Sequence, residues 1–242
     1  MGRTFENRKQ AIFARSDRLS KIFSRLSREI IIAIKQGGGA TPDTNPALRR
    51  VLQNARSASM PKDKVEAAIA RATGQGSDAN YEEALYEGYA PHGIALLVVA
   101  ATDNPTRTVA NVRVCFNKCG GTLGNSGSVA FLFNKVGFFQ LRPDGVDRES
   151  LELELIDYGL EELTEGTGEK GDPVLIARCG FTEFGRMANF LEAQGAPIVS
   201  SGLEHVPLST TELSDEQTDD VLKLIARLED DDDVQAVYHN MG

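Results

Sequence analysis

Tryptophan is absent from this sequence, cysteine and histidine occur three times each, and no apolar run is long. The longest, Ile94–Ala101, is far shorter than the ~18 residues that a membrane-spanning helix needs. Three cysteines cannot build a paired disulfide framework, so they indicate a reducing compartment. No apolar stretch follows the basic N-terminus as it would in a secretory signal. The sequence therefore predicts a cytoplasmic protein that has no membrane partner.

What the sequence does contain is enough apolar material for a large buried core. Of its 242 residues, 41% are hydrophobic, which is more than a disordered chain contains. At roughly 100–200 residues per domain, this length predicts one large domain or two to three small ones.

The charged residues are distributed unevenly along the chain. Residues 1–75 hold 15 of the 26 Lys and Arg but only six of the 35 Asp and Glu. The net charge of −9 therefore combines a basic N-terminal segment, at +9, with an acidic remainder, at −18. A basic segment of this kind is typical of proteins that bind a polyanion. The alternative is that helical surfaces are often rich in Lys and Arg by chance.

The N-terminal segment has the pattern of a small helical bundle. Residues 7–35 predict one long helix, which Gly37–Gly39 end because glycine tolerates positive φ angles. Asn45 followed by proline is typical of a helix N-cap and first turn, and it predicts a second helix over Pro46–Ala58. A third helix is expected over residues 61–73. Short connections between three helices favour a compact bundle.

The long helix separates an apolar face from a cationic face, at about 100° per residue. We expect the first face to enter the bundle core and the second to point to solvent. The apolar face holds Leu19, Phe23, Leu26, Ile30 and Ile34, and the cationic face holds Arg18, Lys21, Arg25, Arg28 and Lys35. The other two helices are expected to pack through Leu48, Val51, Leu52, Val65 and Ile69.

From Tyr81 onward strands and helices are mixed, so the predicted fold class is α+β, with layered units after an all-helical head. Ile94–Ala101 is bounded by turn residues, which predicts a buried central strand. Further strands are expected at 84–89, 129–133, 136–141, 174–179, 198–206 and 234–238. Helices are expected at 106–118, at 148–158 after the N-cap Asp147, at 183–194, and from the capping box at Ser214 to about Leu228.

No pattern in the sequence predicts catalysis. None of His92, His205 and His239 neighbours a serine, cysteine or acid in a nucleophile-like arrangement. Cys115 and Cys119 lie four residues apart on a predicted helix, but a zinc site would need two more ligands nearby, so buried structural cysteines are the better interpretation. We therefore expect a protein that is not an enzyme and has no metal, no cofactor and no small-molecule substrate.

Three polar segments call for interpretation. The backbone amides of Gly120–Ser128 could form an anion-binding nest, although tight turns explain the same glycines without a ligand and are favoured. Asp103–Thr108 could line a cleft, or Asp103 or Asn104 could simply cap the following helix. The acidic run Glu229–Asp233 is expected to be a solvated loop.

Nucleic-acid binding has the strongest support, because phosphate contacts need Lys and Arg on a rigid face. The long helix supplies such a face, and the next two helices extend it. No zinc-finger spacing, basic-zipper heptad or aromatic ribonucleoprotein motif is present, so the sequence predicts no particular mode of base readout. The predicted nucleic-acid-binding residues are Arg8, Lys9, Arg15, Arg18, Lys21, Arg25, Arg28, Lys35, Arg49, Arg50, Arg56, Lys62 and Lys64.

Motifs in order along nearly the whole chain resemble the YebC family. They include Arg28–Ile30, Gly37–Gly39, Asn45–Arg49, Met60–Asp63, Thr73–Gly74, Tyr86–Tyr89, Thr102–Asn104, Arg107–Thr108, Val112–Arg113, Gly120–Val129 and Asp233–Asn240. The chain departs from the family at its start, where Gly2–Lys9 replaces the usual Gly-His-Ser-Lys-Trp opening. Because this opening is part of the presumed binding head, its partner preference could differ from that of other members.

The resemblance implies three domains: a helical head at 1–78, a discontinuous α+β domain at 79–130 and 207–242, and an α+β domain inserted at 131–206. Family members are described as probable transcriptional regulators, and a mitochondrial relative activates translation of a cytochrome oxidase subunit. The family is not known for an enzymatic activity. These properties are expectations that follow from the resemblance.

Two functions use the same electrostatics, so the sequence does not separate them. The cations would contact DNA in a transcriptional regulator, or ribosomal RNA in a ribosome-associated translation factor. The resemblance favours the regulator. A structural or protein-interaction module without polyanion affinity is the third hypothesis.

Overall fold

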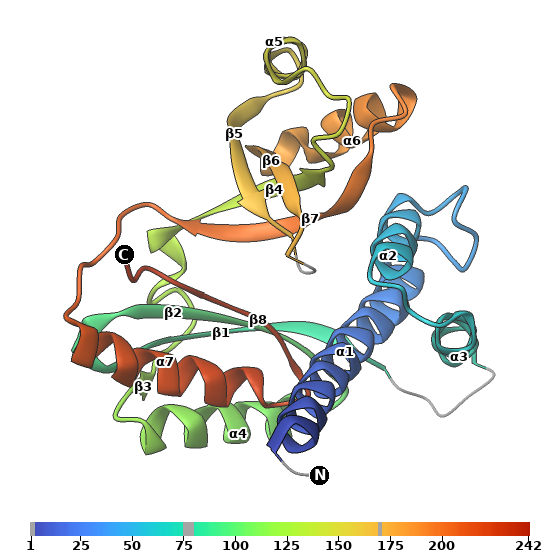
Figure 1. The fold of residues 1–242 in the computed structure, drawn as a ribbon. Coiled ribbons are helices and arrows are strands. Elements are labelled where there is room, and N and C mark those ends of the chain that lie inside the picture. The colour runs from blue at the N-terminus through green and yellow to red at the C-terminus, as the bar shows by residue number, and fades with distance from the viewer. Residues whose placement is uncertain (1–2, 75–79, 169–170) are drawn as a thin grey trace.

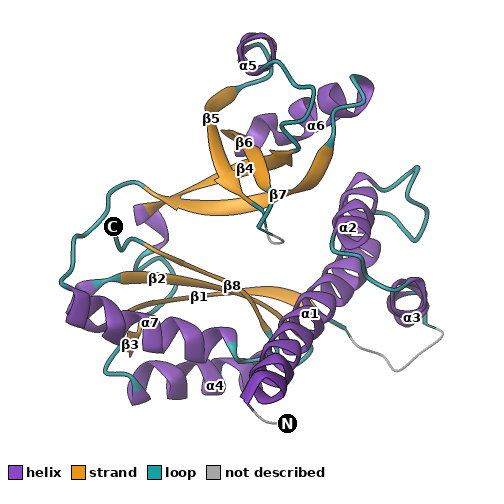
Figure 2. Cartoon of the chain, viewed as in Figure 1, coloured by secondary structure: helices purple, strands orange, loops and turns teal. Residues whose placement is uncertain are grey.

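A computed structural model describes residues 3–74, 80–168 and 171–242, with the side chains of the first helix described from Arg18 onward. Within these residues the chain forms seven α-helices and two four-stranded antiparallel sheets, which confirms the predicted α+β class. Figure 1 shows the long first helix running beside both sheets. Figure 2 shows that helices cover the outer face of each sheet, while the other faces of the two sheets look toward each other.

The head consists of three helices, α1 (Arg3–Gln36), α2 (Pro46–Ser57) and α3 (Lys62–Ala72). Its core holds Leu26, Ile30 and Ile34 of the predicted apolar face of α1, with Phe23 partly buried against it, whereas Leu19 is not part of this cluster. Leu48, Val51 and Ala55 of α2 and Ala68 of α3 complete this core, with Val65 and Ile69 partly buried against it. Every residue of this cluster belongs to the head.

The junction between α1 and α2 is organised by the buried N-cap Asn45. Its side-chain oxygen accepts a hydrogen bond from the Leu48 amide at 3.0 Å, while its amide group donates to Ala33 O and Gly39 O at 2.8 and 2.9 Å. A Cβ at Gly37 would lie 2.4 Å from the Asn45 Oδ1 atom, so only glycine fits there. The predicted cap therefore also fixes how the two helices meet.

The first sheet has the strand order β3-β1-β2-β8. Its strands are β1 (Glu82–Tyr89), β2 (Ala95–Thr102), β3 (Thr122–Leu123) and β8 (Val234–His239), and α4 (Pro105–Lys118) and α7 (Asp215–Glu229) cover one face. As predicted, β2 is a central strand that is buried on both faces. Asn104 caps α4, and Ser214 with Gln217 forms the predicted capping box of α7.

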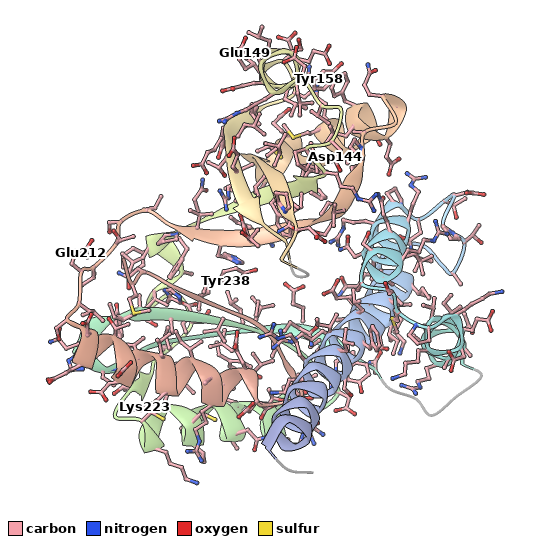
Figure 3. The ribbon with its side chains drawn as sticks, in the orientation of Figure 1. Asp144, Glu149, Tyr158, Glu212, Lys223 and Tyr238 are labelled. Atoms are coloured by element: carbon pink, nitrogen blue, oxygen red, sulfur yellow. The ribbon has the colours of Figure 1, made fainter. Side chains whose placement is uncertain are left out.

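The second sheet has the strand order β5-β6-β4-β7 and comes between β3 and β8 in the chain. Its elements are β4 (Phe133–Leu141), α5 (Arg148–Ile156), β5 (Leu160–Thr167), β6 (Pro173–Gly180), α6 (Phe184–Ala193) and β7 (Ile198–Pro207). Figure 3 shows Tyr238 of β8 in the space between the two sheets, where its hydroxyl donates to Leu203 O at 3.4 Å. The three-domain boundaries implied by the resemblance stay a prediction.

The strand prediction was wrong in three places, one of which is the short strand β3, which was not predicted. Residues 129–133 do not form a strand: Ala130–Leu132 is a 3-10 turn, and β4 begins at Phe133. The turn forms because the Glu87 carboxylate binds backbone amides of this segment. Strand β5 was not predicted. It is an edge strand rich in exposed glutamates, and Leu163 is its buried residue, so its sequence lacks the apolar pattern of a strand.

Candidate nucleic-acid interface

The structure divides the predicted cations of the head into two groups. One group has no carboxylate partner or only a local one, and the other contacts the rest of the chain. The side chains of Arg8, Lys9 and Arg15 lie outside the described side chains of α1.

The side chains of Arg18, Arg25 and Arg56 form no ion pair or hydrogen bond within the described residues. Arg18 and Arg56 are exposed, and Arg25 is half-buried beside a cavity. Lys62 is almost fully exposed, at 90%, and its partner Glu66 lies one helical turn away at 3.5 Å. Lys64 lies over the Phe23 ring, 5.2 Å from its centre. We call these five residues the outer cations.

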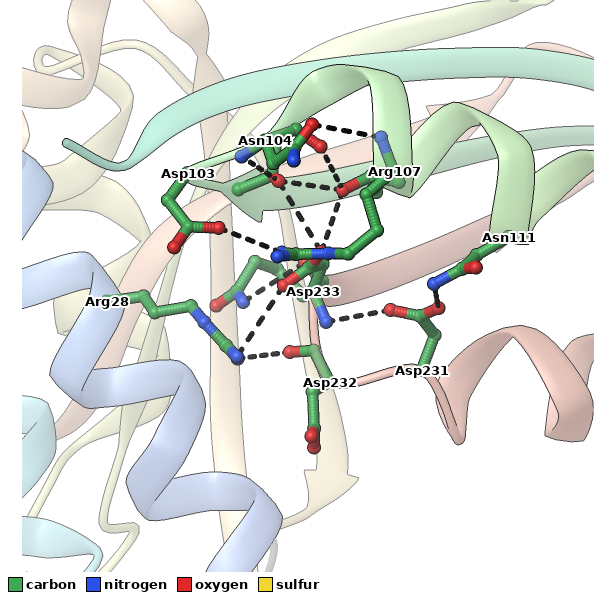
Figure 4. A network of polar contacts seen from close by, with 11 residues as sticks. Arg28, Asp103, Asn104, Arg107, Asn111, Asp231, Asp232 and Asp233 are labelled. Atoms are coloured by element: carbon green, nitrogen blue, oxygen red, sulfur yellow. Dashed lines mark hydrogen bonds and ion pairs between the residues drawn. The ribbon is translucent and has the colours of Figure 1, made fainter. Parts of the chain in front are cut away.

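Lys21 and Arg28 instead contact the acidic loop Glu229–Asp233, which runs from the last residue of α7 to the start of β8. Lys21 Nζ pairs with Asp230 Oδ1 at 2.5 Å. Arg28 donates to the main-chain oxygen of Asp232 and lies 3.7 Å from a carboxylate oxygen of Asp233, as Figure 4 shows. Its side chain is only 11% exposed. The expectation that all five cations of this helix face solvent is therefore wrong for Arg28, because a loop from the far end of the chain covers it.

Lys35 and the two arginines of α2 also have partners. Lys35 donates to Asn80 Oδ1 at 3.0 Å, and Arg49 Nε lies 3.4 Å from a Glu192 carboxylate oxygen. Arg50 donates to Ser201 O at 3.4 Å. Burial lowers the pKa of Arg50 and outweighs the opposing effect of nearby acids. Together with Lys21 and Arg28, we call these residues the docked cations, because each is engaged with a residue beyond the head helices.

The acidic loop that receives Lys21 and Arg28 is itself held by α4. Asp233 Oδ2 accepts hydrogen bonds from Arg107 and from the Thr108 hydroxyl, both at 2.7 Å. Burial raises the pKa of Asp233, but these two donors and the positive charge of Arg107 outweigh it and leave the pKa below its ordinary value. Asp231 accepts from the Asn111 side chain at 3.0 Å (Figure 4). Asp233 is thus an ionised carboxylate that side chains of α4 hold in place.

The prediction of a fully solvated acidic loop is consequently wrong for Asp233, whose side chain is 7% exposed. The missed signal was complementarity between the two ends of the chain, an acidic run in one and a cationic helix face in the other. Of the two interpretations of Asp103–Thr108, the cap is observed: Asn104 Oδ1 accepts from the Arg107 amide at 3.1 Å. Asp103 pairs with Arg107 at 2.8 Å.

The Gly-rich segment forms an anion nest, and the anion is internal. The buried Glu87 carboxylate accepts from the amides of Gly127, Val129 and Ala130 at 2.6, 2.7 and 2.8 Å. Burial raises the pKa of Glu87, but these backbone donors outweigh it and lower the pKa. Because its own carboxylate fills the nest, these amides are not available to a phosphate.

A cavity of about 750 Å³ lies where the head meets the second sheet and β8. Its walls come from α1 and α2 on one side and from β4, β6 and β7 on the other. The charged residues around it include Arg25, Glu29, Arg142 and Asp144. Asp144 lies on the side of the second-sheet unit that faces the head, as Figure 3 shows. The cavity carries acids as well as cations and so does not form a uniformly basic groove.

The described residues contain no group of three or more His, Cys, Asp or Glu side chains that could hold a metal ion. The three cysteines are free thiols, and burial raises the pKa of Cys179 to about 11. A thiol with a raised pKa is a poor nucleophile. Among the residues described, no helix has the length and apolarity needed to cross a membrane.

The chain is similar to known proteins over its full length. Residues 3–75 match the TACO1/YebC N-terminal domain, and residues 81–241 match the TACO1/YebC second and third domain. A protein of Anaeromyxobacter dehalogenans and one of Myxococcus xanthus are each 56% identical over 242 residues, covering 100% of both chains. Both bear the name "probable transcriptional regulatory protein".

A solved structure has the same fold. The crystal structure of a conserved hypothetical protein from Aquifex aeolicus superposes with a TM-score of 0.80 at 38% identity, covering 92% of this chain and 90% of that one. Both family models match, and together they cover nearly the whole chain. The relatives are more than half identical to it over its full length. This chain belongs to the TACO1/YebC family.

Proposed function

We propose that this chain is a nucleic-acid-binding regulatory protein, a transcriptional regulator that contacts DNA phosphates through its basic helical head. The observation that carries the proposal is the set of outer cations Arg18, Arg25, Arg56, Lys62 and Lys64, none of which has a carboxylate partner from outside the head. They lie on three helices that share one apolar core, so their spacing is rigid. The names of the relatives support a regulatory role.

The second candidate is a translation factor that binds ribosomal RNA. The distribution of the outer cations favours it: they are spread over α1, the end of α2 and the first turn of α3 rather than gathered on one helix that could enter a major groove. Such a distribution suits backbone and shape recognition. Both candidates predict phosphate contacts through the same residues.

Binding measurements test the proposal shared by both candidates. A labelled random-sequence DNA duplex and a ribosomal RNA stem-loop are titrated with the whole protein at ~50 mM and ~200 mM salt. We expect saturable binding whose affinity falls steeply at the higher salt, since cations that contact phosphates release counterions. If the protein binds neither probe at the lower salt, the proposal is disproved.

Crosslinking in cells separates the two candidates. The protein is crosslinked to nucleic acid, purified under denaturing conditions, and the bound fragments are sequenced. Enrichment of promoter DNA supports the transcriptional regulator, and enrichment of ribosomal RNA supports the translation factor. A variant with Arg18, Arg25 and Arg56 replaced by alanine is the control, because its crosslinks through the outer cations should be lost.

A further inference from the structure

The acidic loop Glu229–Asp233 presents to α1 what a nucleic acid would present, a row of closely spaced negative oxygens. It occupies Lys21 and Arg28, two of the cations predicted to contact phosphates. A side chain that pairs with this loop cannot at the same time pair with a phosphate. The loop therefore stands where a bound polyanion would have to be.

The loop is also held by bonds that do not involve the head. Asp233 is held by Arg107 and Thr108, and Asp231 accepts from the Asn111 side chain and from the Asp233 amide at 2.9 Å. The charge of Asp233 is thus compensated by Arg107 whether or not Arg28 is present. Moving the head away would leave no buried carboxylate without a partner, so the cost of opening on this side is small.

The hold of the head on the loop is weak. Lys21 and Asp230 form an ion pair in which both side chains are substantially exposed, at 43% and 75%, and pairs of this kind are screened by water and salt. Arg28 uses a main-chain oxygen as its closest acceptor, and its buried Nε has no hydrogen-bond partner. The Asp232 carboxylate is exposed. These contacts are of the kind that a competing polyanion can replace.

Hydrogen bonds also join the head to the second-sheet unit. Asn54 forms two hydrogen bonds with the main chain of Ser201, at 2.9 and 3.1 Å, and Gln53 donates to Ile198 O at 3.2 Å. The apolar core of the head includes no residue from either sheet. A junction whose two sides have separate apolar core clusters favours relative movement of the two sides.

We propose that the loop Glu229–Asp233 is an internal competitor that keeps the head closed on the acidic body, meaning the two sheets and the helices that cover them. Nucleic acid displaces the loop from Lys21 and Arg28. This inference rests on the proposed function of the head. Binding then opens the junction, because the nucleic acid interacts more favourably with the open arrangement, in which these two cations are accessible. The loop thereby weakens the binding of any polyanion that uses Lys21 and Arg28, because such a polyanion must first displace it.

The first test is the affinity of the whole protein for a fluorescein-labelled random-sequence DNA duplex. The double variant Asp230→Asn/Asp232→Asn removes two exposed carboxylates, which form no ion pair or hydrogen bond with residues outside the head in the described part of the chain. We expect it to bind about threefold to tenfold more tightly than the wild type at low salt. Glu152→Gln/Glu154→Gln makes the same charge change on the exposed surface of α5, far from α1 (Figure 1), and should give a much smaller gain.

The second test measures opening. Dyes are attached to Ala67→Cys on α3 and Asp219→Cys on α7, both exposed positions, in a Cys119→Ser background. Energy transfer should fall when the duplex is added to the wild type, and should already be lower in free Asp230→Asn/Asp232→Asn.

The outcomes distinguish this inference from the proposed function. If the wild type binds the duplex but the loop variant gains no more affinity than the α5 control, the internal competitor is disproved and the proposed function stands. Energy transfer that stays constant on binding disproves it equally. If the wild type binds neither the duplex nor the RNA stem-loop, the proposed function fails. The inference fails with it, because there is then no nucleic acid that competes with the loop.

Discussion

The outer and the docked cations of the head come from the same basic segment and differ in what the fold places against them. Arg18 and Arg56 are exposed and free of carboxylates in the described part of the chain, whereas Arg28 is nearly covered and Arg50 is half-buried. In the sequence all four contribute equally to the positive charge. The difference teaches that a charge count locates a polyanion-binding domain but not the residues that remain available for binding.

The largest effect on stability is expected at Asp233, and it shows whether the acidic loop is held independently of the head. Replacing Asp233 with Ala removes the acceptor of Arg107 and Thr108 and should lower the free energy of unfolding by about 2–4 kcal/mol. Urea unfolding at neutral pH measures this. Arg28→Ala is the matched control, since we expect it to cost much less. Equal losses from both variants would mean that the loop depends on the head.

The pH dependence of Asp233 follows from its lowered pKa. A carboxylate whose pKa is lower in the folded than in the unfolded protein contributes stability above the unfolded pKa, near 3.9 for Asp, and loses it as the pH falls through the folded value. The gap in stability between wild type and Asp233→Ala should therefore be constant near neutral pH and shrink in acid below about pH 4. A gap that widened in acid would contradict this assignment.

The second effect concerns binding by the outer cations. The triple variant Arg18→Ala/Arg25→Ala/Arg56→Ala should reduce affinity for a DNA or RNA probe about 30-fold. It should also make the plot of log K against log salt less steep, reducing the magnitude of its slope by about three. Titrations over a salt series give both quantities. Arg113→Ala/Arg148→Ala/Arg186→Ala removes the same charge from the body and should leave the slope unchanged.

A smaller effect is expected in the Gly-rich segment. Glu87→Gln keeps the shape of the side chain but leaves one of the three amide donors with a poorer or missing acceptor, which should cost about 1–2 kcal/mol of unfolding free energy. Because the pKa of Glu87 is lowered in the folded state, this cost should also diminish in acid. Nucleic-acid affinity should not change. A loss of affinity would mean that the nest takes part in binding.

The smallest effect concerns the polar junction between α2 and β7. Asn54→Ala removes two hydrogen bonds to Ser201 and should lower the free energy of unfolding by about 1 kcal/mol. If the junction opens on binding, the same variant should bind nucleic acid slightly more tightly than the wild type. Weaker binding would indicate that the closed arrangement is the one that binds.

Local patterns predicted much of the fold. The apolar spacing of α1, the N-caps at Asn45, Asp147 and Ser214, and the apolar strand β2 were all read from neighbouring residues, because each depends on interactions over a few positions. Strand β5 and the turn at Ala130–Leu132 were not, since a polar edge strand and a distant carboxylate leave no local signal. For the candidate site, the basic head was predictable and the partners of its cations were not.

The sequence by itself determined that a basic amphipathic helix would form and bury one face in a helical bundle, because helix periodicity and apolar burial act between nearby residues. Only the tertiary structure decided which cations stay free. Arg28 meets a loop more than 200 positions away, and Arg50 meets β7. Such pairings are set by how complete units dock, through charges whose interaction depends on distance in space and not on separation along the chain.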